Sequence, residues 1–196
     1  MTEHASSRHL IVGLGNPGRS FRMNRHNVGF MLLDRLAQDA GSSFRRRQGN
    51  SLVTDGRIDG LKVILAKPQS FMNTSGGPVA SLVRFFQIPL DHLLVVLDDL
   101  DLPLGTIRLR GSGGSAGHRG MQSIVSRLGS EEFPRLRLGI GRPPGRMDPA
   151  DFVLKDFADS DSELLKMTLD RALDCVRCLL LEGLELAMTQ FNGTIA

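Results

Sequence analysis

One histidine stands where it could act as a base on water. His26 follows a glycine-rich turn at residues 13–18, and a carboxylate, Asp98, comes later in the chain, directly after an apolar run. The unperturbed pKa of imidazole suits proton removal from water near neutral pH. Asp98 could orient the ring, and Asn16 and Asn73 could hold a substrate. These residue types together predict a hydrolytic site.

The elements that must position these residues alternate along the chain. The expected elements are strands over 9–14, 93–97, 106–110 and 135–140, a hairpin over 57–65, and helices over 28–37, 78–86, 121–128 and 164–181. Strand 135–140 alternates arginine with apolar residues, as a half-exposed strand does, and the chain is expected to end in a long helix and a short tail. This order predicts an α/β fold, a single domain with a twisted mixed β-sheet flanked by helices.

Both members of the candidate pair fall at ends of elements. His26 precedes the first helix, where the positive end of the helix dipole favours the neutral, base-competent imidazole. Asp98 follows a buried strand, at the end where open α/β sheets place their sites. Asn73 lies in a polar loop between a strand and a helix.

Length and composition agree with one soluble domain over residues 1–196. The content is 41% hydrophobic and 23% charged, which is enough to fill a core. Residues 1–8 are polar and are expected to form a flexible N-terminal extension. We find neither a secretory signal nor an apolar run long enough to cross a bilayer, so a cytoplasmic protein is expected.

Charge is distributed unevenly along the chain. Basic residues exceed acidic ones over 1–147, whereas acidic residues exceed basic ones over 148–196, and 20 of the 24 basic residues are arginine. The planar guanidinium matches phosphate bidentately and stacks on bases. An anionic partner is one explanation, and a solvated arginine-rich surface is the other.

Two short motifs could suggest other chemistry. Residues 13–18 fit the dinucleotide fingerprint G-x-G-x-x-G, but a polar segment separates them from the helix that should open at the glycines. Residues 113–117 fit the G-x-S-x-G of a nucleophile elbow, but only His118 follows Ser115, so a serine, acid and histidine cannot occur in the required order. The second motif is better interpreted as a flexible loop that could close over a substrate.

The two cysteines, Cys175 and Cys178, lie three residues apart in the expected helix 164–181. No second pair of ligands accompanies them, and no strand-to-helix turn precedes them as in a redox motif. Two thiols on a buried face are the favoured interpretation.

Taken in order, the motifs resemble those of the bacterial peptidyl-tRNA hydrolase family. They are G-L-G-N-P-G at 13–18, R-H-N-V-G at 25–29, K-P at 67–68 with F-M-N at 71–73, D-D-L-D-L-P at 98–103, G-H-R-G at 117–120 and R-L-G-I-G-R-P at 137–143. The resemblance extends from Leu10 to about Phe157. It implies metal-free hydrolysis of the ester that joins a peptide to the 3′ end of tRNA, which returns the tRNA to translation.

The resemblance also implies roles for individual residues. His26 would be the general base, and Asp98 would accept a hydrogen bond from its ring. Asn16 and Asn73 would hold the peptide backbone and the attacking water, beside an apolar wall that includes Met72. An amide suits that task because it donates and accepts at once.

Further positions complete the expected substrate and tRNA sites. Phe21, His118 and Arg119 are expected to bind substrate, although the family often has tyrosine at the first position and asparagine at the third. Basic side chains expected to hold the 5′ phosphate and acceptor stem are Arg108, Arg110 and Arg137. Phosphate contacts position a nucleic acid without reading its sequence. The acidic residues 174–196 are not expected to contact RNA.

The resemblance implies no cofactor and no metal, with peptidyl-tRNA as the partner of a monomer. Three other functions stay open on the sequence alone. They are a non-catalytic RNA-binding protein of the same fold, a nicotinamide-dependent enzyme, and a hydrolase of other small acyl esters or peptides, whose activity would be insensitive to salt.

Overall fold

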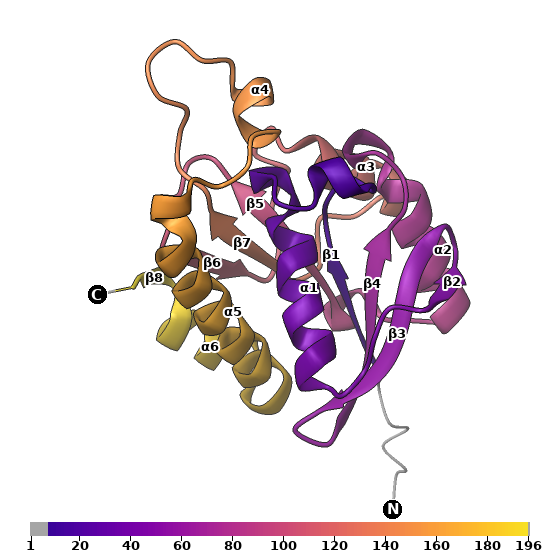
Figure 1. The fold of residues 1–196 in the computed structure, drawn as a ribbon. Helices are drawn as coiled ribbons and strands as arrows, with labels where there is room; N and C mark the ends of the chain where they lie inside the picture. The colour runs from indigo at the N-terminus through magenta and orange to yellow at the C-terminus, as the bar shows by residue number, and fades with distance from the viewer. Residues whose placement is uncertain (1–7, 196) are drawn as a thin grey trace, which may run out of the picture.

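A mixed sheet forms the centre of the molecule (Figure 1). The computed structural model describes residues 8–195, so the predicted N-terminal extension lies outside the described residues apart from Arg8. The strands are β1 His9–Gly13, β2 Arg46–Gln48, β3 Ser51–Ile58, β4 Leu61–Pro68, β5 Leu93–Asp99, β6 Thr106–Arg110, β7 Arg135–Gly139 and β8 Gly193–Thr194. Their order across the sheet is β2-β3-β4-β1-β5-β7-β6-β8.

The central strands run parallel and the outer ones antiparallel. Strand β1 pairs with β4 and β5, and β5 pairs with β7, all in parallel. The remaining pairs are antiparallel, including the predicted hairpin of β3 and β4. Asp59 and Gly60 at its turn have φ angles of 48° and 85°, as an Asp-Gly turn between apolar strands requires.

Helices cover both faces of the sheet. They are α1 Val28–Asp39, α2 Gly76–Phe86, α3 Arg119–Leu128, α4 Pro149–Val153, α5 Ser162–Glu182 and α6 Leu184–Phe191. Helices α1, α5 and α6 share one apolar core with one face, and they stand in front of the sheet in Figure 1. Helices α2 and α3 share a second core with the other face. The predicted α/β fold with a mixed, helix-flanked sheet is confirmed.

Alternation along β1 shows how the two cores arise. Ile11 points to the core of α1, whereas Leu10 and Val12 point to the core of α2. A strand buried on both faces needs a continuous apolar run, and L-I-V supplies it.

The end of β1 and the start of α1 approach closely through two glycines. A Cβ atom on Gly13 would lie 2.4 Å from the carbonyl oxygen of Gly29, and one on Gly29 would lie 2.6 Å from the backbone nitrogen of Leu14. Helix α1 begins only at Val28. The first glycine of the turn therefore serves packing of strand against helix, and the helix does not open from the turn as a dinucleotide site requires.

Three expectations about local structure were wrong. Strand β7 is not half-exposed, because it lies between β5 and β6 and Arg135 is only 2% exposed. The last described elements are two helices and a short strand, since Gly183, with a φ of 92°, separates α5 from α6. Cys178 is only partly buried, beside Gln190 of α6, whereas Cys175 is buried.

Burial raises the pKa of the Cys175 thiol to about 12. At neutral pH this side chain is therefore an uncharged group packed in the core. None of the helices within residues 8–195 combines the length and apolar character that a membrane crossing requires.

Candidate active site

The predicted site residues gather at a cleft beyond the carboxyl ends of β1 and β5. The cleft has a volume of about 990 Å³. Predicted residues that line it are Asn16, His26, Met72, Asn73, Asp98, His118, Arg119 and Arg137. The segment that holds α4 rises above the same end of the sheet in Figure 1 and contributes Pro149, Val153 and Leu154 to the wall.

His26 and Asp98 form a hydrogen-bonded pair. The distance from His26 Nδ1 to Asp98 Oδ1 is 2.8 Å, and Asp98 is only 3% exposed at the end of β5. Because the Asp98 carboxylate can only accept this hydrogen bond, His26 Nδ1 carries the proton, and His26 Nε2 is left with its lone pair. Nε2 makes no hydrogen bond to any described residue. A histidine arranged in this way can accept a proton from a molecule in the cleft.

The surroundings keep the Asp98 carboxylate ionised. Burial on its own raises its pKa, but the interactions of the carboxylate with the imidazoles of His26 and His118 outweigh burial and hold the pKa of Asp98 well below its usual range. An ionised carboxylate stabilises the imidazolium that would form on His26 during proton transfer.

Asn16 is held on both sides. Its backbone nitrogen donates to Asn27 Oδ1 and its backbone oxygen accepts from Asn27 Nδ2, both at 2.9 Å. Its side-chain Oδ1 accepts from the backbone nitrogen of Met72 at 2.8 Å. The amide orientation is therefore fixed, and the Asn16 Nδ2 group remains as a donor. Asn27 was not predicted as a site residue, although its place directly after His26 was a usable signal.

Met72 and Asn73 lie in a short 3₁₀ turn, Met72–Thr74, before α2. Met72 is 5% exposed and forms part of the apolar wall, whereas the Asn73 side chain is exposed to the cleft. Phe71, which precedes them, also lines the cleft and is 64% exposed. It was not predicted, because an exposed aromatic side chain looks the same in sequence as a buried one.

His118 does not stand free in the cleft. Its Nε2 lies 2.9 Å from Asp98 Oδ1, and its Nδ1 accepts from the backbone nitrogen of Met121 at 3.2 Å. Both ring nitrogens are thus engaged within the protein, which leaves no free donor or acceptor for a substrate. Arg119, the first residue of α3, lines the cleft and is exposed.

The three predicted tRNA-binding arginines do not all reach the cleft. Arg137 lines it, and its Nε lies 2.7 Å from Asp99 Oδ2. Arg108 pairs directly with Arg137 across β6 and β7, and Arg110 lies two residues further along β6 on the same face. The arginines therefore form a basic strip that leads away from the cleft. Phe21, in the 3₁₀ turn Arg19–Phe21, is not among the residues that line the cleft.

Arg135 shares the face of that strip but is buried. Its guanidinium donates to backbone oxygens of Gly113, Gly114, Glu131 and Phe133, and it stacks on the Phe133 ring. These contacts hold the start of the loop that carries His118. Sequence reasoning missed this role, since nothing in the alternation of β7 separates Arg135 from Arg137.

The loop of His26 is held by the acidic segment after α4. Arg25 forms an ion pair with Asp161 at 3.3 Å, and Asn24 Nδ2 donates to Asp156 Oδ1 at 2.6 Å. The Arg25 guanidinium also lies 4.4 Å from the centre of the Phe152 ring. The uneven charge distribution was the only sequence signal for this contact, and it did not indicate the partners.

The donor atoms of His26, Asp98 and His118 lie within 4.8 Å of one another, a spacing that also suits a metal ion. Both imidazole nitrogens, however, lie at hydrogen-bond distance from the same carboxylate oxygen. In this arrangement the three side chains bind one another.

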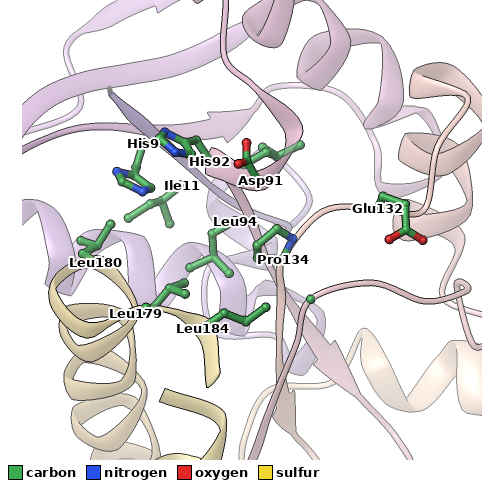
Figure 2. Close-up of a pocket in the computed structure, with 13 residues that line it drawn as sticks. His9, Ile11, Asp91, His92, Leu94, Glu132, Pro134, Leu179, Leu180 and Leu184 are labelled. Carbon is green, nitrogen blue, oxygen red and sulfur yellow. The ribbon is translucent and has the colours of Figure 1, made fainter. Parts of the chain in front are cut away.

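A second cavity, of about 400 Å³, opens near the amino ends of β1 and β5 (Figure 2). His9 and His92 stack there with 4.4 Å between ring centroids, beside an apolar lining that includes Leu179 and Leu184. No described carboxylate accepts a hydrogen bond from either ring, and burial lowers the pKa of His9. This cavity has no oriented base, so the cleft around His26 is the candidate active site.

Comparison with known proteins gives the same result. A family profile described as Peptidyl-tRNA hydrolase matches residues 10–196. The peptidyl-tRNA hydrolase of Carboxydothermus hydrogenoformans is 51% identical over 183 residues, which cover 93% of this chain and 97% of the relative. That of Frankia casuarinae is 46% identical over 186 residues, which cover 95% and 94%.

Solved structures agree at the level of the fold. A crystal structure of peptidyl-tRNA hydrolase from Acinetobacter baumannii matches with a TM-score of 0.90 and 35% sequence identity, and the match covers 98% of both chains. Sequence and fold thus point to one group of proteins over almost the whole length. The chain belongs to the peptidyl-tRNA hydrolase family.

Proposed function

We propose that this protein hydrolyses the ester bond between a peptide and the 3′ end of tRNA in peptidyl-tRNA, with His26 as the general base. The observation that carries the proposal is the pair of His26 and Asp98. Its 2.8 Å hydrogen bond fixes the tautomer in which Nε2 is unprotonated in the cleft. An ester is a reactive acyl group, so water activated by one base suffices and a nucleophilic serine is not needed.

The reaction proceeds in two proton transfers. His26 Nε2 takes a proton from water as the water oxygen forms a bond to the ester carbonyl carbon. The resulting imidazolium is stabilised by Asp98. When the tetrahedral intermediate collapses, the bond to the ribose oxygen breaks and His26 returns the proton to that oxygen. The products are a peptide carboxylic acid, which ionises, and a tRNA with a free 3′-terminal hydroxyl.

Two asparagines support this chemistry. Asn16 Nδ2 is the free donor of an amide whose Oδ1 already accepts from Met72, so it is oriented in advance toward an oxyanion or a peptide carbonyl. Asn73 offers a second amide to the cleft, and this side chain is exposed. Met72 and Phe71 supply apolar surface for the acyl group.

The basic strip is the proposed path of the tRNA. Arg137 binds Asp99 through Nε, and its two terminal nitrogens are left for a phosphate. Arg108 and Arg110 continue the strip on the same face of the sheet. Arg119 places one more cation at the cleft, where it can contact a phosphate or a carbonyl oxygen. We propose that the protein acts as a monomer in the cytoplasm, with one chain supplying the whole cleft. We also propose that it acts without a metal, since the side chains of His26, Asp98 and His118 bind one another.

The test is release of an N-acetylated amino acid from its tRNA, compared with release from unblocked aminoacyl-tRNA. Wild-type protein should release only the blocked amino acid, and His26→Ala should lose that release while keeping its circular dichroism spectrum. Full activity of His26→Ala would contradict the mechanism. Absence of release by wild type, with tRNA still bound, would favour a non-catalytic RNA-binding protein.

A further inference from the structure

Asp98 Oδ1 accepts hydrogen bonds from two imidazoles at once. His26 Nδ1 lies at 2.8 Å and His118 Nε2 at 2.9 Å, and the ring centroids are 5.2 Å apart at an angle of 49°. The two rings come from different parts of the fold, the turn before α1 and the N-terminus of α3. Two histidines on one carboxylate raise the question of which of them takes the proton.

The N-terminus of α3 determines which nitrogen of His118 carries the proton. The backbone N–H of Met121 points at His118 Nδ1, at 3.2 Å, so this nitrogen must carry the lone pair. The proton of the neutral ring is then on Nε2, which donates to Asp98. Protonating His118 would set an Nδ1–H against the N–H of Met121 and would add a positive charge at the positive end of a helix of ten residues.

His26 has no such constraint. Its Nδ1 donates to Asp98 and its Nε2 meets no described donor, so a proton can be added there without loss of a hydrogen bond. The two rings are chemically alike but differ in what occupies their second nitrogen. The other charged side chains that line the cleft are Asp99, Asp101, Arg119, Arg137, Arg142 and Asp148.

We propose that His118 is a positioning residue, an imidazole fixed in one tautomer that holds Asp98 Oδ1 so that His26 alone of the two histidines takes up the proton of the attacking water. The inference rests on the proposed function only for its catalytic consequence. Helix α3 fixes the tautomer of His118, His118 fixes the Asp98 carboxylate, and Asp98 fixes His26. This assignment replaces substrate binding as the role of His118.

The tautomers can be measured in the free protein without any substrate. Imidazole ¹⁵N chemical shifts of wild type should show His118 protonated on Nε2 and not on Nδ1, whereas the neutral His26 ring should carry its proton on Nδ1. A His118 ring protonated on Nδ1, whether alone or together with Nε2, would overturn the inference. Because no turnover is involved, this result is independent of whether peptidyl-tRNA is the substrate.

Two substitutions then separate the cap from the contact with Asp98. His118→Asn keeps a side chain that caps helices well but is too short to reach Asp98. His118→Gln extends an amide N–H toward the place of Nε2 and caps less well. With N-acetylated aminoacyl-tRNA, we expect His118→Asn to lower kcat about tenfold with KM changed less than about twofold, and His118→Gln to recover most of kcat.

Either of two kinetic results would overturn the inference. One is a defect of His118→Asn in KM alone, which would indicate a substrate-binding residue. The other is a kcat equal to that of wild type, which would show that the contact with Asp98 has no catalytic role. Thermal unfolding of both variants checks that each still folds. If wild type did not hydrolyse the substrate at all, the proposed function would fail while the tautomer measurement would still decide the role of His118.

Discussion

Arg137 and Asp99 form an ion pair at the wall of the cleft, with 2.7 Å between Nε and Oδ2. The pair limits the rotation of the guanidinium, and its two terminal nitrogens form no hydrogen bond or ion pair with residues 8–195. Asp99 is 7% exposed, so the contact is sheltered from solvent and salt. A guanidinium held in this way is prepared for bidentate binding of phosphate.

Arg137→Ala should raise KM for peptidyl-tRNA more than it lowers kcat, because it removes binding and leaves the chemistry in place. The slope of log KM against the logarithm of the salt concentration should decrease by about 1, which corresponds to the loss of one phosphate contact. Asp99→Asn should raise KM by a smaller factor, since the arginine stays but is less well held. Arg35→Ala is the matched control, because Arg35 pairs with Asp170 on the other face of the sheet. A defect of Arg137→Ala confined to kcat would refute the prediction.

His26→Ala should reduce turnover by about 10²- to 10⁴-fold, the usual contribution of general acid–base catalysis, with the fold intact. Asp98→Ala should keep a small part of the turnover, because His26 keeps its basic nitrogen but loses its fixed tautomer. Single-turnover rates with saturating enzyme separate this loss from binding. An Asp98→Ala variant as active as wild type would show that the 2.8 Å hydrogen bond does not matter for the reaction.

The acidic segment after α4 should matter for catalysis although it is far from His26 in sequence. Asp156→Ala removes the acceptor of Asn24 Nδ2 and should loosen the turn that holds His26. We expect a loss of about 1 kcal/mol in the free energy of unfolding and a several-fold lower kcat. Asp159→Ala is the control, since Asp159 is exposed and Asn24 and Arg25 bind Asp156 and Asp161 instead. Equal kcat values for the two variants would contradict this role.

Much of the fold follows from local signals in the sequence. The L-I-V of β1 and the L-L-V-V-L of β5 are continuous apolar runs, which are typical of strands buried on both faces. Asp59-Gly60 directly indicates the hairpin of β3 and β4. Asp98 could be placed at the carboxyl end of β5 because the apolar run stops there. These features are encoded within a few residues of one another.

Other parts of the site depend on contacts between distant segments. The burial of Arg135 is stabilised by backbone oxygens from residues 113 to 133, and no local pattern shows that they converge. The second bond of Asp98 to His118 likewise depends on how α3 packs against the sheet. The sequence also assigned no role to Asp156 and Asp161, which hold the loop of His26.

The lowered pKa of Asp98 predicts a pH dependence of stability. The folded protein binds this proton less readily than the unfolded chain, whose carboxyl titrates near the ordinary value of 3.8. Asp98 therefore stabilises the fold above that pH, and the contribution is lost as pH falls toward the folded pKa. The difference in unfolding free energy between wild type and Asp98→Asn should be largest above about pH 5 and should shrink toward about pH 2.5. Urea unfolding at several pH values measures it, with Asp159→Asn as an exposed control; a constant difference would contradict the assignment.

Arg135 connects the sheet to the loop of His118. Arg135→Lys keeps the positive charge but replaces a planar group with five donors by an ammonium with three. Arg135 reaches the carbonyl oxygen of Gly113 with one terminal nitrogen and those of Glu131 and Phe133 with the other, and the single nitrogen of lysine cannot occupy both places. We therefore expect the free energy of unfolding to fall by about 2 kcal/mol. Kcat should fall as well, since the His118 loop loses its anchor. Arg110→Lys, at the paired and exposed position of β6, should leave the stability within about 0.5 kcal/mol of wild type. If Arg135→Lys were as stable and as active as Arg110→Lys, the buried guanidinium would not be the anchor of the loop.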